Sequence, residues 1–394
     1  MTVSFSINTI QYSTDNCQTW NELPADTATP VINSGDKISF KATGLVTDDW
    51  DGIGTFTVNK NFNLKGNVMS MLFGDEGKNS YDLTEYNYAF YDLFYECTTL
   101  QSVSKDFLPA TTLAESCYNG MFYGCTSLVN APELPATTLT QNCYNYMFCD
   151  CTSLVTVPEL PATTLAEYCY CGMFYGCTSL TTAPELPATT LTESCYEEMF
   201  NGCTSLVTAP ELPATTLGTY CYDSMFADCY SLTTAPELPA TTLANNCYDS
   251  MFKGCTSLVT APALPATTLA DSCYYYMFYG CTSLVTAPSI LPATTLANYG
   301  CYRSMFKGCT SLVSAPELPA TALADYCYYE MFQGCTSLSY IKAMFTTTPS
   351  SRYTGNWVGG VSSTGTFVKN AAATWNVIGS NGVPEGWTVE TATA

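Results

Sequence analysis

The chain has 394 residues, of which 47% are hydrophobic and only 12% are charged, against about 25% charged residues in typical soluble proteins. Its 34 acidic and 12 basic residues give a formal net charge of −22. That charge argues against nucleic acid or an anionic membrane surface as a partner, because both would be repelled. The absence of histidine removes the Ser–His and Cys–His dyads and the commonest zinc ligand. We therefore expect no histidine-based catalytic site, and no cofactor is predicted.

Neither a membrane span nor a secretion signal is predicted. No run of 18 apolar residues occurs in the sequence, so we expect no transmembrane helix. The N-terminal residues MTVSFSINTI lack the basic region and the continuous apolar region of a signal peptide. Either a signal has been removed, or the protein reaches its site of action without one, as virion proteins released by lysis do.

Residues 1–86 do not repeat and are expected to form a small β-rich N-terminal cap domain. Segments such as KISFKATG and GTFTVNKNF alternate apolar and polar residues, as short antiparallel strands do. The segment STDNCQTW resembles an Asp-box, S-x-D-x-G-x-T-W, with Cys17 at the glycine position. In that motif the Ser and Asp side chains tie a hairpin turn, so the implied role is structural. The acidic loop DDWDG at 48–52 is a solvated turn or, as the alternative, a Ca²⁺ loop.

From residue 87 to residue 345 the chain is a 26-residue repeat, whose unit first appears in full at Cys125 as CTSLVNAPELPATTLTQNCYNYMF. The spacing is regular apart from two extra residues around Ser289 and Ile290 and a degenerate first copy at Cys97. Self-similarity at about 20–50 residues is the signature of a solenoid, in which each unit buries its apolar face against its neighbours. The leading cysteines of the full copies are Cys125, Cys151, Cys177, Cys203, Cys229, Cys255, Cys281, Cys309 and Cys335.

Each copy is predicted to contain one helix and one short strand. In PATTLAESCYNGMFYG, Thr112 and Glu115 match the T-x-x-E capping box that starts a helix. Leu113 and Cys117 begin the spacing of a buried helical stripe, and Gly124 suits the left-handed residue that ends a helix. The segment CTSLVNA is then a strand, which the prolines that follow limit to about four or five residues.

A strand and a helix in a unit of this length fall in the range of leucine-rich repeats, which is about 20–29 residues. The residues MFYGCTSL closely resemble the F-x-G-C-x-x-L core of BspA-like leucine-rich repeats, which occur on surface proteins of Bacteroidales and of some protozoan parasites. The resemblance covers residues 87–345 and implies an α/β repeat solenoid on a surface-exposed binding protein. The chain departs from the family pattern in its longer unit and in its A-P-E-L-P run, where an Ile-rich strand end is common.

Residues 346–394 leave the repeat and are expected to form a β-rich C-terminal cap. GTFVKN, ATWNVIG and GWTVETATA read as strands punctuated by glycine that pair against the last copy. An end cap is physically required, because an uncovered last copy exposes apolar side chains and an unpaired strand edge. The segment VPEGWTV also resembles segments that close similar Bacteroidales surface proteins.

Of the 22 cysteines, 19 fall into two columns, one that begins at Cys117 and one that begins at Cys97. A disulfide needs Cα atoms within about 7 Å, whereas packed helices are about 8–10 Å apart. Strands are only about 5 Å apart, which leaves disulfides open for the strand-side column. Zinc sites need paired spacings such as C-x-x-C. We predict buried thiols that fill the core, with disulfides as the alternative and no metal.

Two further columns are candidates for binding. The tyrosine that follows each helical cysteine either packs between helices or forms a ladder that stacks on sugar rings. The glutamate of A-P-E-L-P either serves solubility or binds a cation or a cationic partner. The candidate binding residues are Glu133, Glu159, Glu185, Glu211, Glu237, Tyr118, Tyr144, Tyr170, Tyr196 and Tyr222.

Positions that change between copies, while the frame stays constant, indicate an exposed surface. They follow the repeated tyrosine and read, for example, Asp249-Ser250, Tyr275-Tyr276 and Arg303-Ser304. The residues just before each helical cysteine also vary and are mostly polar. Drift without constraint gives the same pattern, so these positions locate a surface and not a site.

Three functions remain. The first is a non-catalytic adhesion or recognition protein, extracellular or on a cell surface, that binds a host or bacterial protein or a polysaccharide through its extended repeat face. The second is a bacteriophage fibre or receptor-binding protein, which the missing signal peptide favours and which would form a homo-oligomer. The third is a glycoside-active enzyme, which needs two inward-facing carboxylates in a cleft. We predict the first, with no catalytic residue and no nucleic-acid partner.

Overall fold

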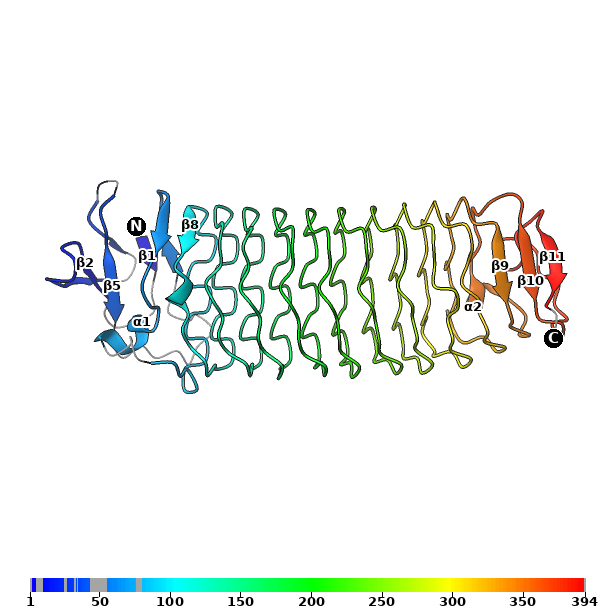
Figure 1. The fold of residues 1–394 in the computed structure, drawn as a ribbon, viewed down its shortest axis with the longest axis horizontal. Coiled ribbons are helices and arrows are strands. Elements are labelled where there is room, and N and C mark those ends of the chain that lie inside the picture. Colours follow the sequence, from blue (N-terminus) through cyan, green and yellow to red (C-terminus); the bar gives the residue numbers. More distant parts are fainter. Residues whose placement is uncertain are drawn as a thin grey trace. The chain divides into compact units, whose positions relative to one another are not determined.

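A computed structural model of the chain (Figure 1) contains two compact units, residues 1–180 and 181–394. Both are built mostly of rungs, each rung being one copy of the repeat. The structure describes residues 2–4, 10–24, 27–31, 33, 35–42, 55–75 and 80–392.

The first unit begins with short strands. Its elements are β1 (Thr2–Ser4), β2 (Ile10–Ser13), β3 (Asn21–Leu23), β4 (Thr27–Ala28), β5 (Ser39–Ala42), β6 (Thr55–Thr57), β7 (Phe62–Leu64), α1 (Ser70–Phe73), β8 (Leu100–Val103) and the 3-10 helix η2 (Lys105–Phe107). Two antiparallel sheets have the strand orders β4-β1-β6 and β3-β2-β5, and β7 pairs with β8 in parallel. The parallel pairing of β7 and β8 is of the same kind as the parallel bridges between the rungs that follow.

The STDNCQTW segment forms the turn between β2 and β3. Asp15 accepts hydrogen bonds from the Thr19 hydroxyl at 2.6 Å, from the Thr19 backbone N–H at 2.9 Å and from the Ser13 hydroxyl at 2.7 Å. These bonds, led by the one from the Thr19 hydroxyl, hold the pKa of Asp15 well below its usual range. Cys17 adopts a φ of 68°, which explains the glycine at this place in the motif. The DDWDG loop at 48–52 lies outside the described residues.

Each rung contains a run of overlapping turns, residues 114–124 and their equivalents, which we call the turn ribbon. In one rung, every odd-numbered backbone N–H from Cys143 to Cys151 donates to the carbonyl three positions back, at 3.1–3.3 Å. Every even-numbered N–H from Asn142 to Asp150 donates instead to a carbonyl of the next rung, at 2.7–3.1 Å. The second unit shows the same alternation. Half of the N–H groups of the turn ribbon therefore join neighbouring rungs.

Every fourth residue of the turn ribbon lies in the left-handed region. The φ angle is 55° at Asn142, 49° at Tyr146 and 56° at Asp150, and in the second unit it is 50° at Ser194 and 73° at Gly202. An α-helix needs φ near −63° at every residue. The predicted helix of each repeat is therefore not confirmed, and turns take its place. The left-handed residues turn alternate N–H groups outwards to the neighbouring rung, which an α-helix cannot do.

The predicted strand of each repeat is reduced to single-residue parallel bridges. Asn130 pairs with Thr156 in the first unit, and a second column of bridges includes Thr138 with Thr164. Prolines before and after these residues lack an N–H group and keep the ladder short. Consecutive bridges in the second unit join Thr182, Thr208, Thr234, Thr260, Thr286 and Ser314. Each unit is thus a repeat solenoid of parallel rungs, with very little regular strand.

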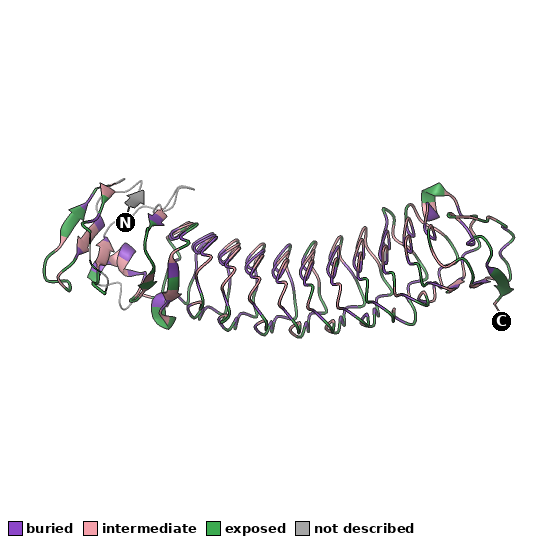
Figure 2. Ribbon diagram, turned by 90° about the horizontal axis from the view of Figure 1, so that it is seen from above, coloured by how far each residue is buried: buried purple, intermediate pink, exposed green. Residues whose placement is uncertain are grey.

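Stacked aromatic ladders fill the core of each unit. The repeated tyrosines stack on one another with ring centroids 5.6–5.9 Å apart. The repeated phenylalanines stack at 5.4–5.8 Å. Both spacings fall within the favourable range of about 4.5–7 Å for aromatic pairs. Figure 2 shows exposed residues recurring at the same place in successive rungs, with buried residues between them.

The second unit ends in a parallel sheet with the order β11-β10-β9 (Figure 1). Its elements are β9 (Tyr340–Ala343), α2 (Ser351–Thr354), β10 (Thr366–Lys369) and β11 (Thr388–Thr391). Tyr340 pairs with Thr366, one repeat length further along the chain, and Phe332 N–H donates to the carbonyl of Trp357 at 2.8 Å as in earlier rungs. The backbone bonding of the rungs thus extends beyond residue 345, although the sequence repeat does not. The domain boundaries at 86 and 345 stay predictions.

Tryptophans close the core at this end of the second unit. Trp357 is 0% exposed and its indole N–H donates to the carbonyl of Gly382 at 2.9 Å. The indole N–H of Trp375 donates to the carbonyl of Phe345 at 3.2 Å. A large ring whose N–H is paired can be buried without leaving an unsatisfied donor. These rings cover apolar surface that an uncapped last rung would expose.

The turn ribbon can be distinguished from a helix by the variant Gly120→Ala. In a helix interior this change stabilises by about 1 kcal/mol. In the structure Gly120 has a φ of 62°, and an added Cβ would lie 2.0 Å from Asp92 Oδ1. We therefore expect the free energy of unfolding in urea to fall by about 1 kcal/mol or more. The neighbouring change Asn119→Ala, outside the left-handed position, should stay within about 0.5 kcal/mol. A more stable Gly120→Ala protein would argue for the helix.

Candidate functional site

The tyrosine ladder lies in the core and not on the surface. The repeated tyrosines are 1% exposed, and burial raises the pKa of Tyr118 and Tyr144 well above the usual value. A ring stacked in a closed core has no face for a ligand. The five candidate residues Tyr118, Tyr144, Tyr170, Tyr196 and Tyr222 are therefore placed as the packing alternative expects, and their position does not favour stacking on sugars.

The glutamate column lies on the surface. The five candidate residues Glu133, Glu159, Glu185, Glu211 and Glu237 are exposed. Glu133 lies 3.5 Å from Lys105 Nζ, in an exposed ion pair of the kind that contributes little to stability. In the second unit a shallow groove of 460 Å³ runs beside Glu237 and Ala263, where the column is first interrupted. The column is accessible, and its binding of a cation or of a cationic partner stays a prediction.

The cysteines have structural contacts. All 22 lie in the described residues and are free thiols, and Cys17 alone among them is exposed. Burial raises the pKa of Cys117 and of Cys335 to about 12, so neither is a nucleophile near neutral pH. In the column that starts each rung, the S–H donates to the carbonyl of a buried phenylalanine earlier in the chain, as Cys255 does to Phe226 at 3.1 Å. These thiols satisfy backbone acceptors as well as filling space.

In the described part of the chain, no three Cys, Asp or Glu side chains are arranged to hold a metal ion. None of the described helices combines the length and the apolar character that crossing a bilayer requires.

The outer face of the turn ribbon carries the residues that differ between rungs. In the second unit the position after the repeated tyrosine is acidic in three successive rungs, at Glu197, Asp223 and Asp249. Desolvation by burial, followed by the charge of Asp249, raises the pKa of Asp223 to about 8. Burial raises the pKa of Asp249 to about 6. Half-buried carboxyl groups one rung apart therefore keep protons in the folded protein that they would lose in water.

In the next three rungs the same position is Tyr275, Arg303 and Tyr329. The Arg303 guanidinium carbon lies 5.3 Å from the ring centroid of Tyr275 and 5.0 Å from that of Tyr329, within reach of a cation–π interaction with both. The Tyr326 ring lies 5.9 Å from the same carbon. Tyr326 is 42% exposed. We call Tyr275, Arg303, Tyr326 and Tyr329 the Tyr–Arg cluster.

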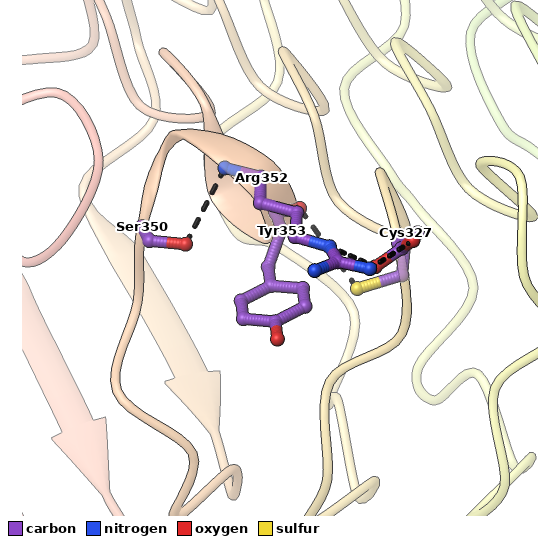
Figure 3. A network of polar contacts seen from close by, with 5 residues as sticks. Cys327, Ser350, Arg352 and Tyr353 are labelled. Carbon is purple, nitrogen blue, oxygen red and sulfur yellow. Dashed lines mark hydrogen bonds and ion pairs between the residues drawn. The ribbon is translucent and has the colours of Figure 1, made fainter.

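An ion pair holds the rung that follows the cluster. Arg352 Nη2 donates to Asp325 Oδ2 at 2.6 Å, which neutralises both charges. The Ser350 hydroxyl accepts from the Arg352 backbone N–H at 3.3 Å and caps α2. The Cys327 thiol lies 3.9 Å from the Tyr353 carbonyl oxygen. Figure 3 shows the Arg352 side chain reaching from α2 towards the rung of Cys327.

Sequence reasoning locates this surface but misses its chemistry. In the sequence, Tyr275, Arg303 and Tyr329 each appear as one changing position of a different copy, and nothing within a single copy relates them to one another. They are one repeat length apart in the chain and stack because the rungs lie in register. Comparing the same position from copy to copy shows three acids followed by Tyr-Arg-Tyr, which is the available sequence signal.

Comparison with known proteins identifies the repeat. A family model described as "BspA type Leucine rich repeat region" matches residues 88–207, 167–312 and 248–354. No curated protein matches the chain. A solved structure titled "Crystal structure of TLR13-ssRNA13 complex" is similar over 80% of this chain and 46% of that chain, at 12% identity and a TM-score of 0.29. The chain thus spans about half the length of that relative, and so distant a likeness carries no functional argument.

The thiol state can be tested by labelling with a maleimide. Native protein should take up one label, at Cys17, because the other cysteines are buried. Protein denatured without a reductant should take up 22 labels, counted by mass spectrometry. In a Cys17→Ser variant the native label should disappear. A large shortfall of labels in the denatured protein would show disulfides in the strand-side column.

The stacked carboxyl groups predict a pH dependence of stability. Because the pKa of Asp223 is raised from 3.8 to about 8, the folded state holds a proton between these pH values that the unfolded state has released. Stability contributed by this group is therefore full at low pH and is lost as the pH rises towards 8. We expect Asp223→Asn to stabilise the protein at pH 8 by at least about 1 kcal/mol and to have little effect at pH 4. The exposed Glu211→Gln should show no such dependence in parallel urea titrations.

Proposed function

Since the chain belongs to the BspA-type leucine-rich repeat family, we propose that it is a non-catalytic recognition protein that acts in adhesion, outside the cell or on a cell surface. Its partner is a protein or a glycan of another cell, bound through the exposed face of the repeat array.

One observation carries this proposal, namely the division of each rung into constant buried residues and changing exposed residues. The repeated Cys, Tyr, Met, Phe and Leu side chains are buried, whereas the positions that change lie on the outer face of the turn ribbon, where Glu197, Asp223, Tyr275 and Arg303 are partly exposed. A constant frame with a changing surface suits recognition, because the surface can vary without loss of the fold.

The acidic residues also favour binding over turnover. A glycosidase needs two carboxyl groups facing one another across a cleft. Here Glu133 and its equivalents form an exposed column, and Asp223 and Asp249 are stacked along one face of the turn ribbon. Neither arrangement encloses a substrate. Repetition instead offers many weak contacts in a row, which can add up to useful avidity for a repetitive partner.

The test is a binding array of purified extracellular-matrix proteins and of glycans, probed with the full chain and with a variant that lacks residues 203–254. The deletion removes two complete rungs and joins Gly202 to Cys255, a Gly-Cys junction like those of the native rungs. Stability in a solenoid is mostly a nearest-neighbour property, so the variant should fold. We expect the full chain to bind a defined subset of the array and the variant to bind it more weakly.

A full chain that binds nothing on the array would count against the proposal. A folded variant that binds as strongly as the full chain would place the site in the rungs outside residues 203–254. Circular dichroism of both proteins serves as the folding control.

A further inference from the structure

Arg303 presents a guanidinium group without a polar partner in the described chain. Its contacts are the rings of Tyr275, Tyr326 and Tyr329, at 5.3, 5.9 and 5.0 Å. Its Nε is buried and has no hydrogen-bond partner, and Arg303 is in no ion pair among the described residues. An arginine side chain has five N–H donors. In a protein with a net charge of −22, an unpaired arginine held in place is a site for an acceptor that comes from outside.

Neighbouring cations on the same surface are already paired. Lys307 Nζ lies 2.8 Å from Glu330 Oε2, and Arg352 is paired with Asp325. These pairs leave Arg303 as the cation of this surface patch whose charge is not balanced by a carboxylate. The patch therefore attracts a single negative charge, while the acidic rungs before it repel a long polyanion.

Two glycines make room for the cluster. An added Cβ at Gly300 would lie 2.9 Å from Arg303 Cβ and 3.3 Å from Arg303 Cδ. An added Cβ at Gly355 would lie 2.6 Å from Tyr329 Cε2. The stem of the arginine and the ring of the tyrosine each pack over a residue without a side chain. This packing limits their freedom, so that little entropy is lost when a ligand binds.

The fold itself does not require these side chains. The position of Arg303 is taken by asparagine or an acid in other rungs, such as Asn119 and Asp249, and the position of Tyr326 by Ser272 or Gly300. The rungs keep the same backbone bonding with either set. Tyr326 has a φ of 56°, as Tyr168 and Tyr220 have at the same position of earlier rungs, so this left-handed conformation belongs to the repeat and is not a feature of the cluster.

We propose that the Tyr–Arg cluster is a subsite for a sugar ring that carries one carboxylate, such as a sialic or uronic acid at the end of a glycan. The carboxylate pairs with the Arg303 guanidinium, whose planar fork matches two carboxylate oxygens. The C–H face of the sugar ring lies on the exposed ring of Tyr326, which binds apolar surface and still offers a hydroxyl. This assignment rests on the proposed recognition function and names its ligand class.

The experiment measures binding of small probes to the full chain by saturation-transfer NMR and by calorimetry. The probes are the methyl glycoside of N-acetylneuraminic acid, methyl glucuronide, methyl galactoside as a neutral sugar, and N-acetylglutamate as a carboxylate without a sugar ring. We expect one of the two acidic sugars to bind, and the galactoside and the N-acetylglutamate to bind at least about tenfold more weakly, because each lacks one half of the recognition.

Variants separate the cluster from the general charge of the surface. Arg303→Gln should lose about tenfold or more in affinity for the acidic sugar, and Arg303→Lys should lose several-fold because the fork is gone although the charge remains. Tyr326→Ala, which changes a 42% exposed side chain, should weaken binding without affecting the fold. Lys253→Gln is the matched control, because it removes an exposed positive charge from the same face and should leave the affinity unchanged.

The inference is overturned if neither acidic sugar binds, if N-acetylglutamate binds as well as the sugars, or if folded Arg303→Gln and Tyr326→Ala proteins bind like the wild type. Urea unfolding of each variant shows whether it is folded. The protein and glycan array, repeated with Arg303→Gln, separates this result from the broader proposal. A variant that keeps every array signal would leave the recognition function standing and remove this subsite.

Discussion

The hydrogen bonds between rungs along the turn ribbon are the constraint on which the rest of each unit depends. A left-handed residue at every fourth position sends alternate N–H groups to the neighbouring rung, as from Asn142 to Asp150. These bonds fix both the spacing and the register of the rungs. Equivalent side chains must then lie directly over one another, so that tyrosine stacks on tyrosine and phenylalanine on phenylalanine within the core. The thiol of a rung-start cysteine reaches a phenylalanine carbonyl of an earlier rung for the same reason, as from Cys255 to Phe226.

The same register decides the chemistry of the outer surface. Side chains at one position of the repeat form a column, so their charges and rings act on one another from rung to rung. Where the column is acidic, burial followed by the charge of Asp249 raises the pKa of Asp223, and two rungs after Asp249 the Arg303 side chain lies between two tyrosine rings. This stacking of Tyr275, Arg303 and Tyr329 on the outer surface resembles the stacking of the tyrosine ladder in the core. A solenoid can therefore change its binding surface by substituting a few positions, while the inter-rung bonds, which come from the backbone, stay the same.

Much of the architecture follows from the sequence alone. A constant period with constant apolar residues requires a solenoid with those residues inside, and the cysteine, tyrosine, methionine, phenylalanine and leucine columns are buried as that argument requires. The Asp-box turn at Asp15 follows in the same way from a local motif. The replacement of the predicted helix by turns does not follow from the sequence. Buried pairs such as Cys117-Tyr118 and Met121-Phe122 recur every four positions, which is close to the 3.6 residues per turn of a helix. Ser116, Gly120 and Gly124, spaced by four, are the sign of left-handed positions.

Only the tertiary structure decided which side chains lie together on the outer surface. The sequence points to Glu133 and Tyr118 and their equivalents as candidates, because they repeat. Repetition in a solenoid, however, marks the frame, and the tyrosines are buried for that reason. Tyr275, Arg303 and Tyr329 differ from rung to rung and are far apart in the chain, so no local pattern connects them. They come together because the inter-rung hydrogen bonds set a register of one repeat length, and a register is a property of neighbouring rungs that a single copy of the repeat does not contain.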